Sequence, residues 1–396
     1  MSNIVIVIAS ISGSNTGLGG HYYDSMVIAE ELSKFNLVNI VNLGDFPANA
    51  LSQSQTPVKY VNIQVNTPNI NRNSLKKCLE NYNPDVIIAF DRMAGLIVRP
   101  LCVELGCGFV LVKPGGGKLS GYYPNNPFQI YFSYKDIHWA LNRRKDGYGK
   151  VCCIPNRVQI PQQDHQAIAK LKHDLSILPN DLVLIRISRI VQGYKPSFLK
   201  AIRLVNFLRD QGYPARLVII GFPQCESTFQ EIKSQLNERD AIVTLKEFTL
   251  NASRLLKIAK INIGIGRGFM EGCAISQHMM AINTEDDLPT VVTEDNFNYF
   301  FQENFSMRVT FQGNEKINQE RIISLAELSM KEVVNSKVSQ KWFREKFSSE
   351  QVCSLYDEIL HLARVLPERW SLDMLYGEFY LKKNGLQRFV KKLIKY

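Results

Sequence analysis

An arginine and a glutamate stand four residues apart in a glycine-rich stretch, GIGRGFMEGCAISQHMMA, which runs from Gly264 to Ala281. An apolar run, LLKIAKINI, precedes it, and small and apolar residues then resume at helical spacing. Arg267 and Glu271 are therefore expected where a helix follows a strand, on a turn whose glycines let a ligand approach the backbone. A carboxylate accepts two hydroxyl donors well, so Glu271 could accept hydrogen bonds from a ligand at this turn.

Two further cations, Arg189 and Lys195, lie in LIRISRIVQGYKPSFLKAI, in a loop between an expected strand and a helix that begins near Pro196. Two cations beyond the carboxyl end of a strand can hold a diphosphate and neutralise a leaving group. Arginine and lysine are also common in ordinary loops, so the pair by itself is a weak signal.

A second glycine-rich turn, SGSNTGLGGHYYDSMVIAEEL, separates the first expected strand from the first helix. Gly17, Gly19 and Gly20 would let a phosphate approach backbone N–H groups at a helix N-terminus. A flexible connector is the alternative interpretation. The spacing is not G-x-G-x-x-G, and the acidic residue of a dinucleotide site does not follow.

Asp91 and Arg92, in AFDRMAG, follow another expected strand of the first half. Asp91 could orient an acceptor hydroxyl, but we favour its simpler role as the cap of the following helix. The eight cysteines form no CxxC pair, the six histidines lie far apart, and no Asp-x-Asp occurs. The sequence therefore predicts no metal and no other cofactor.

Composition is that of a globular protein, with 45% apolar and 21% charged residues in 396. The first residues, MSNIVIVIAS, have no basic segment before the apolar run and are expected to form a buried strand. No apolar stretch reaches the roughly 18–20 residues of a transmembrane helix. We therefore expect a cytoplasmic protein with reduced cysteines.

Apolar runs alternate with helical patterns in two series, which predicts an α/β fold of two doubly wound parallel sheets. The proline-rich segment IPNRVQIPQQDHQ, from Ile154, is interpreted as the linker between them. We expect domains over 1–155 and 156–316, facing a cleft with ligands at the carboxyl ends of the strands, and helices over 317–396. The main helices are predicted at 21–35, 74–82, 96–105, 198–211, 228–237, 252–259 and 270–280.

These motifs together resemble a GT-B glycosyltransferase of family 4, a family of retaining, sugar-nucleotide-dependent enzymes with two Rossmann-like domains. The matching pieces come in the family's order over about residues 1–300: the Gly19–Gly20 turn, IPNRV at the hinge, ISRIVQGYK as the Arg…Lys loop, and GFMEGCAISQHMMAI as the glutamate-containing helix. The resemblance also implies that the C-terminal helices cross back to the first domain.

The resemblance implies a role for each matching residue. Glu271 would hold the ribose hydroxyls of the nucleotide, Arg189 and Lys195 would bind the diphosphate and act catalytically, and Gly19 and Gly20 would face a phosphate. The family's first glutamate falls at Ile263, so Arg267 is the nearby candidate to contact the donor sugar. The family's first-domain histidine also has no clear match.

The family's functions define what we expect here. The chain would move a sugar from a nucleoside-diphosphate sugar to a saccharide or lipid-linked acceptor, with retention and without metal, in bacterial polysaccharide synthesis. A sugar-nucleotide epimerase of the same architecture is one alternative. A basic nucleic-acid-binding protein is another, although no nucleic-acid partner is expected, because the basic excess is terminal and lacks interleaved aromatics.

The chain carries a net charge of +10, and six of its lysines and arginines lie in LKKNGLQRFVKKLIKY, from Leu381 onwards, without an acid. Apolar residues recur there at helical spacing, the pattern of a basic amphipathic helix. The stripe could be a core contact. We favour an anionic membrane surface bound by the segment from Lys382 to Tyr396, which would place the enzyme at the inner face of the membrane.

Overall fold

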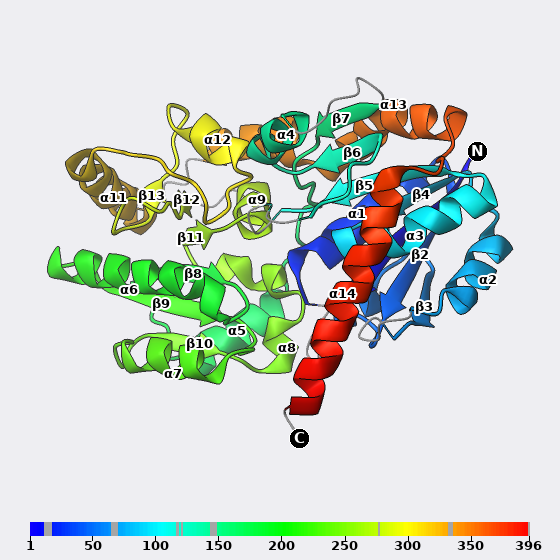
Figure 1. Ribbon diagram of the computed structural model, residues 1–396. Coiled ribbons are helices and arrows are strands. Elements are labelled where there is room, and N and C mark those ends of the chain that lie inside the picture. The colour runs from blue at the N-terminus through cyan, green and yellow to red at the C-terminus, as the bar shows by residue number, and fades with distance from the viewer. Residues whose placement is uncertain are drawn as a thin grey trace. The chain divides into compact units, whose positions relative to one another are not determined.

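The computed structural model describes residues 1–11, 18–64, 70–115, 119, 122–142, 149–275, 278–331 and 336–394, with the side chains of 336, 385–386 and 388–394 left out. The chain divides into two compact units (Figure 1). The first unit joins Met1–Pro155 to Ser349–Tyr396, and the second is Asn156–Ser348. The expected helical segment 317–396 is thus shared: its first part belongs to the second unit and its last part to the first.

The first unit contains a seven-stranded parallel sheet with the order β3-β2-β1-β4-β5-β6-β7. Its central strands are continuous apolar runs buried on both faces, as parallel sheets require. The strands are β1 (Asn3–Ser10), β2 (Leu37–Gly44), β3 (Val58–Asn62), β4 (Val86–Ala89), β5 (Gly108–Lys113), β6 (Phe128–Tyr131) and β7 (Lys150–Cys153).

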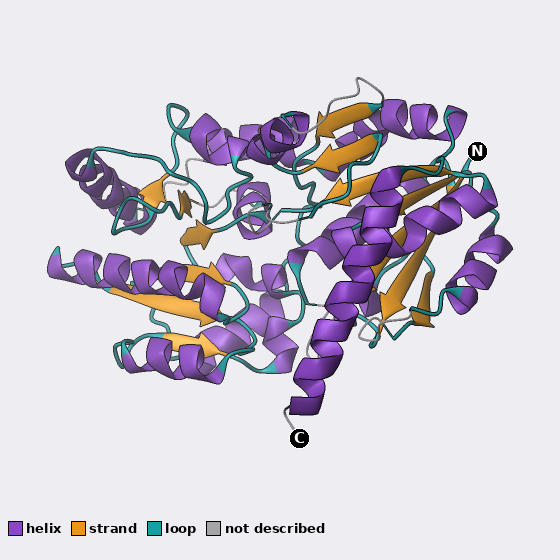
Figure 2. Cartoon of the chain, viewed as in Figure 1, coloured by secondary structure: helices purple, strands orange, loops and turns teal. Residues whose placement is uncertain are grey.

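Helices cover both faces of this sheet (Figure 2). Ile4, Ile6 and Ile8 of β1 pack with α1 and α13 on one face, whereas Val5 and Val7 pack with α2 and α3 on the other. The helices are α1 (Gly20–Ser33), α2 (Asn73–Tyr82), α3 (Arg92–Leu105), α4 (Tyr134–Leu141), α13 (Val352–Val365) and α14 (Leu372–Ile394), with 3-10 turns η1 (Asn49–Gln53) and η5 (Ser349–Gln351).

The second unit repeats the same strand order with six strands, β10-β9-β8-β11-β12-β13, of which only β13 runs antiparallel to its neighbour. In both sheets the first strand is central and the fourth lies beside it, the order of a Rossmann-like doubly wound fold. The strands are β8 (Leu182–Ile187), β9 (Ala215–Ile220), β10 (Ala241–Val243), β11 (Ile261–Gly264), β12 (His278–Ala281) and β13 (Thr290–Val291).

The helices of the second unit also cover both faces. Leu182 and Leu184 of β8 pack with α6 and α11, whereas Val183 and Ile185 pack with α5 and η3. The helices are α5 (His165–Asp174), α6 (Lys195–Asp210), α7 (Glu226–Ser234), α8 (Lys246–Thr249), α9 (Arg267–Ala274), α10 (Phe297–Gln302), α11 (Glu315–Met330) and α12 (Ser336–Trp342), with 3-10 segments η2 (Gln192–Tyr194) and η3 (Ala252–Ile258) and a π-turn η4 (Phe343–Phe347).

The helix expected over 270–280 is shorter than predicted and lies earlier. It is α9, which ends at Ala274, and His278–Ala281 is a buried strand paired in parallel with β11. The apolar spacing of HMMA fits a helix as well as a strand, and only the open edge of β11 decides between them. The helix α4 was not predicted: the run IYFSY ends as a strand at Tyr131, and Ser133 caps the helix by accepting from the Asp136 N–H at 3.3 Å.

The predicted linker from Ile154 is not a simple exposed connection. Arg157 is buried and its Nη1 donates to the Lys346 carbonyl at 2.5 Å, while Val158 forms a β-bridge with Ser348 inside the second unit. The segment then enters α5, whose cap Asp164 accepts from the Ala167 N–H at 2.9 Å. The prolines therefore predicted where the two units meet in the sequence. They did not predict that the residues just after the boundary pack inside the second unit.

None of the helices in the described part of the chain is long and apolar enough to cross a membrane. All eight cysteines are free thiols.

Candidate functional site

In the second unit, the neighbouring strands β8 and β11 lead to helices on opposite faces of the sheet. From β8 the chain enters α6, on the Leu184 face, while from β11 it enters α9, on the Asn262 face. Their ends are close together, because a Cβ placed on Gly268 would lie 4.0 Å from the Ile187 carbonyl oxygen. Such a switch point opens a crevice at the carboxyl ends of the strands, where doubly wound folds bind ligands.

The cations of the β8–α6 connection lie on the side of β9. Arg189 is partly buried, and its Nη1 donates to Gln224 Oε1 at 3.3 Å. Lys195 is the first residue of α6, and its Nζ is 2.5 Å from Glu231 Oε1 of α7. The structure thus brings both predicted cations to the loops beyond β8 and β9, where they have partners from the chain itself.

Arg267 and Glu271 form an ion pair on the first turns of α9. The Arg267 Nε is 2.7 Å from Glu271 Oε1, and the two side chains are only 16% and 13% exposed. Burial raises the pKa of the Glu271 carboxyl above its usual value, although Arg267 acts in the opposite direction. The expected neighbours are therefore joined, and the arginine fixes the orientation of the carboxylate.

The glycines of this stretch serve packing more than ligand access, which corrects the first interpretation. A Cβ on Gly264 would lie 2.4 Å from the Phe269 Cα, and one on Gly272 would lie 2.2 Å from Asn262 Nδ2. Gly266 has φ +51°, in the left-handed region that side chains disfavour. These three glycines let α9 turn sharply and lie close on β11 and β12. At Gly268 a Cβ would make only an ordinary contact, at 4.0 Å from the Ile187 carbonyl oxygen.

Ile263 cannot contact a ligand, because it is a fully buried residue of β11. Only Ile265 and Gly266 separate β11 from α9. The position at which the resembling family has its first glutamate therefore falls inside the sheet here. Arg267 is the first charged side chain after that strand.

The first unit has an equivalent switch point between β1 and β4, with α1 and α3 on opposite faces. Gly19 precedes α1 with φ −74° and ψ 150°, an extended conformation open to any residue, and Gly20 is the first residue of the helix. Gly19 is the N-cap residue, and as a glycine it has no side chain that could cap the helix. Gly17 lies outside the described residues, so the expected phosphate-facing turn is only partly visible.

Asp91 and Arg92 are engaged inside the first unit. Asp91 Oδ1 accepts from the Ala94 N–H at 2.7 Å and Oδ2 accepts from the Ala9 N–H at 2.8 Å, which confirms the favoured capping role. Burial raises the pKa of this carboxyl. Arg92 Nη1 donates to the Tyr122 carbonyl at 2.9 Å, and its guanidinium lies 5.1 Å from the centre of the Tyr380 ring.

The strand β5 ends at Lys113, in the region where the resembling family has its histidine. Lys113 is buried and its Nζ lies 2.9 Å from Asp136 Oδ2. The ion pair gives Lys113 a structural role.

Sequence reasoning missed the residues that follow β9. Gln224 holds Arg189, and the next residue, Cys225, precedes α7. Hydrogen bonds with Ser227 and Thr228 lower the pKa of the Cys225 thiol to about 7. The signal was available, because GFPQC follows a predicted strand as the other candidate loops do. Among the described residues, no group of three His, Cys, Asp or Glu side chains could hold a metal ion.

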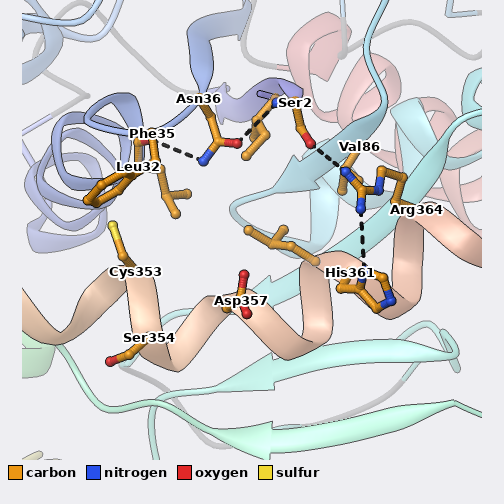
Figure 3. Close-up of a pocket in the computed structure, with 12 residues that line it drawn as sticks. Ser2, Leu32, Phe35, Asn36, Val86, Cys353, Ser354, Asp357, His361 and Arg364 are labelled. Atoms are coloured by element: carbon orange, nitrogen blue, oxygen red, sulfur yellow. Dashed lines mark hydrogen bonds between the residues drawn. The ribbon is translucent and has the colours of Figure 1, made fainter.

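A pocket of about 500 Å³ lies elsewhere, at the amino ends of the strands of the first unit (Figure 3). Asp357 and His361 of α13 point towards Ser2 and Val86, and Arg364 donates to Ser2 Oγ at 2.8 Å. This is the edge opposite the switch point. We therefore do not assign the candidate site to it.

Comparison by sequence finds no family model and no curated protein that matches the chain. Comparison by structure does find relatives. HepE from Anabaena, crystallised with UDP and glucose, matches with a TM-score of 0.61 and 14% identity over 90% of this chain and 99% of its own. A glycosyltransferase from Rickettsia africae gives 0.63 and 12% over 91% and 98%.

An epimerase has the same architecture. The UDP-GlcNAc 2-epimerase of Methanocaldococcus jannaschii matches with a TM-score of 0.54 and 13% identity over 90% of this chain and 99% of its own. At these identities the likeness concerns the fold. It confirms the predicted fold class, two Rossmann-like α/β units of the GT-B type with a helical C-terminal segment.

Proposed function

We propose that the chain is a glycosyltransferase that uses a nucleoside-diphosphate sugar, bound at the switch point between β8 and β11. The observation that supports this most is that charged side chains follow both strands: Arg189 in the connection after β8, Lys195 at the start of α6, and the Arg267–Glu271 pair on the first turns of α9. Two solved structures of the same fold are complexes with UDP, one with glucose and one without it. UDP is therefore the nucleotide to test first.

Each residue has a chemical role in the proposal. Arg267 occupies Glu271 Oε1, so Oε2 is the atom that we expect to accept a ribose hydroxyl. Arg189 and Lys195 would meet the diphosphate, whose negative charge grows as the sugar departs. Lys195 would exchange Glu231 for a phosphate oxygen. Because protein cations supply this charge, we expect transfer without a metal, and by the family resemblance with retention.

The proposed acceptor is a saccharide or lipid-linked hydroxyl, in polysaccharide synthesis. By the family resemblance, Gly19 and Gly20 at the start of α1 are proposed to face a phosphate. Asp91 and Arg92 are not proposed as acceptor residues, because their polar atoms bind the first unit itself.

Calorimetry with UDP tests the site. Glu271→Ala should weaken UDP binding by about 1.5–3 kcal/mol, the value of a charge-assisted hydrogen bond. Glu294→Ala is the matched control, since this carboxylate also pairs with a cation, Lys341, but at an exposed position. Unchanged UDP affinity of Glu271→Ala, with a folded protein, would remove the nucleotide site from this switch point.

An epimerase is the second candidate, because the Methanocaldococcus enzyme has the same fold. Against it, Glu231 and Glu271 are both ion-paired, whereas epimerisation needs a carboxylate or histidine to remove a proton. Incubation with UDP-GlcNAc and UDP-glucose separates the two. A transferase releases UDP only when an acceptor is added, and EDTA should not stop it; an epimerase converts UDP-GlcNAc without an acceptor.

A further inference from the structure

The last helix, α14, drawn in red in Figure 1, is buried on one face and exposed on the opposite face. Met374 and Leu381 are buried, and a Cβ on Gly377 would lie 2.9 Å from Leu96 Cδ2 of α3. The opposite side is apolar and open. Its members, which we call the α14 apolar face, are Leu372, Leu375, Tyr376 and Phe379, with exposed fractions of 77%, 59%, 68% and 66%.

Ion pairs fix this orientation of the helix. Glu378 is 2.7 Å from Arg72 Nη2, and Asp373 is 2.8 Å from Arg99 Nη1, a buried guanidinium that also pairs with Glu368. The acids of α14 are thus directed to the first unit. The α14 apolar face cannot turn inward without breaking these pairs. The ion pairs therefore keep this face exposed.

Cations border the α14 apolar face on its C-terminal side. Lys382 and Lys383 are exposed, and Lys383 follows Phe379 by four residues, one helical turn further along. No acidic residue follows Glu378, while Arg388, Lys391, Lys392 and Lys395 do. The exposed apolar side chains of α14 are therefore followed by a segment in which every charged residue is basic.

We propose that the α14 apolar face and its bordering lysines dock the protein on an anionic lipid bilayer. Leucines and a phenylalanine can enter the acyl boundary, tyrosine suits the interface, and the lysines attract acidic headgroups. Parallel pairing with a second copy of this chain fits the face less well, because it would bring the two lysine-rich ends together. The apolar stripe that the sequence predicts after Leu381 falls on side chains outside the described ones, and the α14 apolar face precedes it along the helix.

Vesicle co-sedimentation of the full chain tests this without any nucleotide, so its result is independent of the proposed transfer reaction. Vesicles of phosphatidylglycerol mixed with phosphatidylcholine should pellet the protein, and phosphatidylcholine alone should not. A triple variant, Leu372→Ser, Leu375→Ser and Phe379→Ser, should lower the partition coefficient at least about tenfold. Lys382→Glu with Lys383→Glu should lower it by about thirtyfold.

The matched control removes three exposed apolar side chains from the second unit: Ile160→Ser, Leu178→Ser and Leu245→Ser, which are 65%, 60% and 62% exposed. It should bind vesicles like the parent. Circular dichroism should show all variants folded, and Leu375→Ser alone replaces the triple variant if that one does not fold.

Three outcomes would overturn the proposal. They are equal pelleting of the α14 variants and the parent, equal pelleting with neutral vesicles, and a dimer in sedimentation equilibrium that the triple variant abolishes. The last result would make a second copy the occupant of the face.

Discussion

The two switch points of this molecule have the same topology and different chemistry. Between β1 and β4 of the first unit, the polar residue Asp91 binds two backbone N–H groups of its own unit, at 2.7 and 2.8 Å. Between β8 and β11 of the second unit, Arg267 pairs with Glu271, while Arg189 and Lys195 bond the side chains of Gln224 and Glu231. The carboxylate at the first switch point is held by backbone groups, whereas the charged residues at the second are held by side chains that they can exchange.

This difference shows that strand order locates a possible ligand site, whereas side chains decide whether charge is available there. A side chain held by backbone N–H groups leaves them unsatisfied if it moves. A lysine paired with a partly exposed glutamate can exchange it for a phosphate oxygen at little cost, because such surface pairs contribute little to stability. We therefore expect the two switch points to respond oppositely to substitution.

The largest effect is expected from Gly264→Ala in the second unit. The added Cβ would lie 2.4 Å from the Phe269 Cα and 2.6 Å from its backbone nitrogen, so α9 must shift. We expect a loss of about 3 kcal/mol in the free energy of unfolding of that unit. Denaturant titration with probes in each unit checks it, and Gly268→Ala is the control, because its added Cβ would make only an ordinary contact, 4.0 Å from the Ile187 carbonyl oxygen. Equal stabilities would show that the tight turn relaxes freely.

Asp91→Ala comes second and acts on the first unit. It removes the cap of α3 and leaves the Ala9 N–H without its acceptor, which together should cost about 2–3 kcal/mol. UDP affinity should not change, because the residue has a structural role. A variant with normal stability and impaired transfer would instead return Asp91 to the acceptor site.

Much of the fold could be predicted because strands of a buried parallel sheet have continuous apolar sequences. The run NIVIVIA and the run DVIIAF are such cases, and both became central strands. The errors occurred where the local pattern fits two structures. HMMA at His278 is apolar and short, and it became strand β12 because it pairs with β11, which no local pattern reveals.

The site could be predicted only to the level of loops. The sequence placed Arg189 and Arg267 after strands that prove to be neighbours, so their approach follows from topology. It could not show that Asp91 bonds Ala9, which is 82 positions away, or that Gly264 is needed by Phe269. Such contacts depend on tertiary packing, which no local pattern in the sequence reveals.

Arg189→Ala and Lys195→Ala should each weaken UDP binding by about 1.5 kcal/mol, with little change in stability. Both side chains are partly exposed and held by side-chain partners, Gln224 and Glu231. Arg92→Ala is the control in the first unit, since this arginine donates to the Tyr122 carbonyl. If calorimetry found UDP affinity reduced by Arg92→Ala and not by the other two variants, the UDP site would have to be assigned to the first unit instead of the second.

The smallest effect concerns two cysteines, one in each unit. The pKa of the Cys225 thiol is lowered to about 7 by hydrogen bonds with Ser227 and Thr228, whereas burial raises the pKa of Cys353 above its usual value. The thiolate reacts with alkylating agents, and its fraction grows as pH rises through the pKa. Alkylation of Cys225 by iodoacetamide should therefore increase from pH 6 to 8 and then level off, while Cys353 should still be accelerating.

The effect of UDP on the two alkylation rates tests where the nucleotide binds. Gln224, the residue before Cys225, holds Arg189, so a diphosphate bound by Arg189 would place negative charge near the thiol. That charge should raise the thiol pKa and slow alkylation of Cys225 about two- to threefold at pH 7, and added salt should weaken the effect. Peptide mass spectrometry measures both cysteines in one sample, with Cys353 as the internal control. Slowing at Cys353 alone would place UDP on the first unit; equal slowing at both would indicate a change in the whole protein.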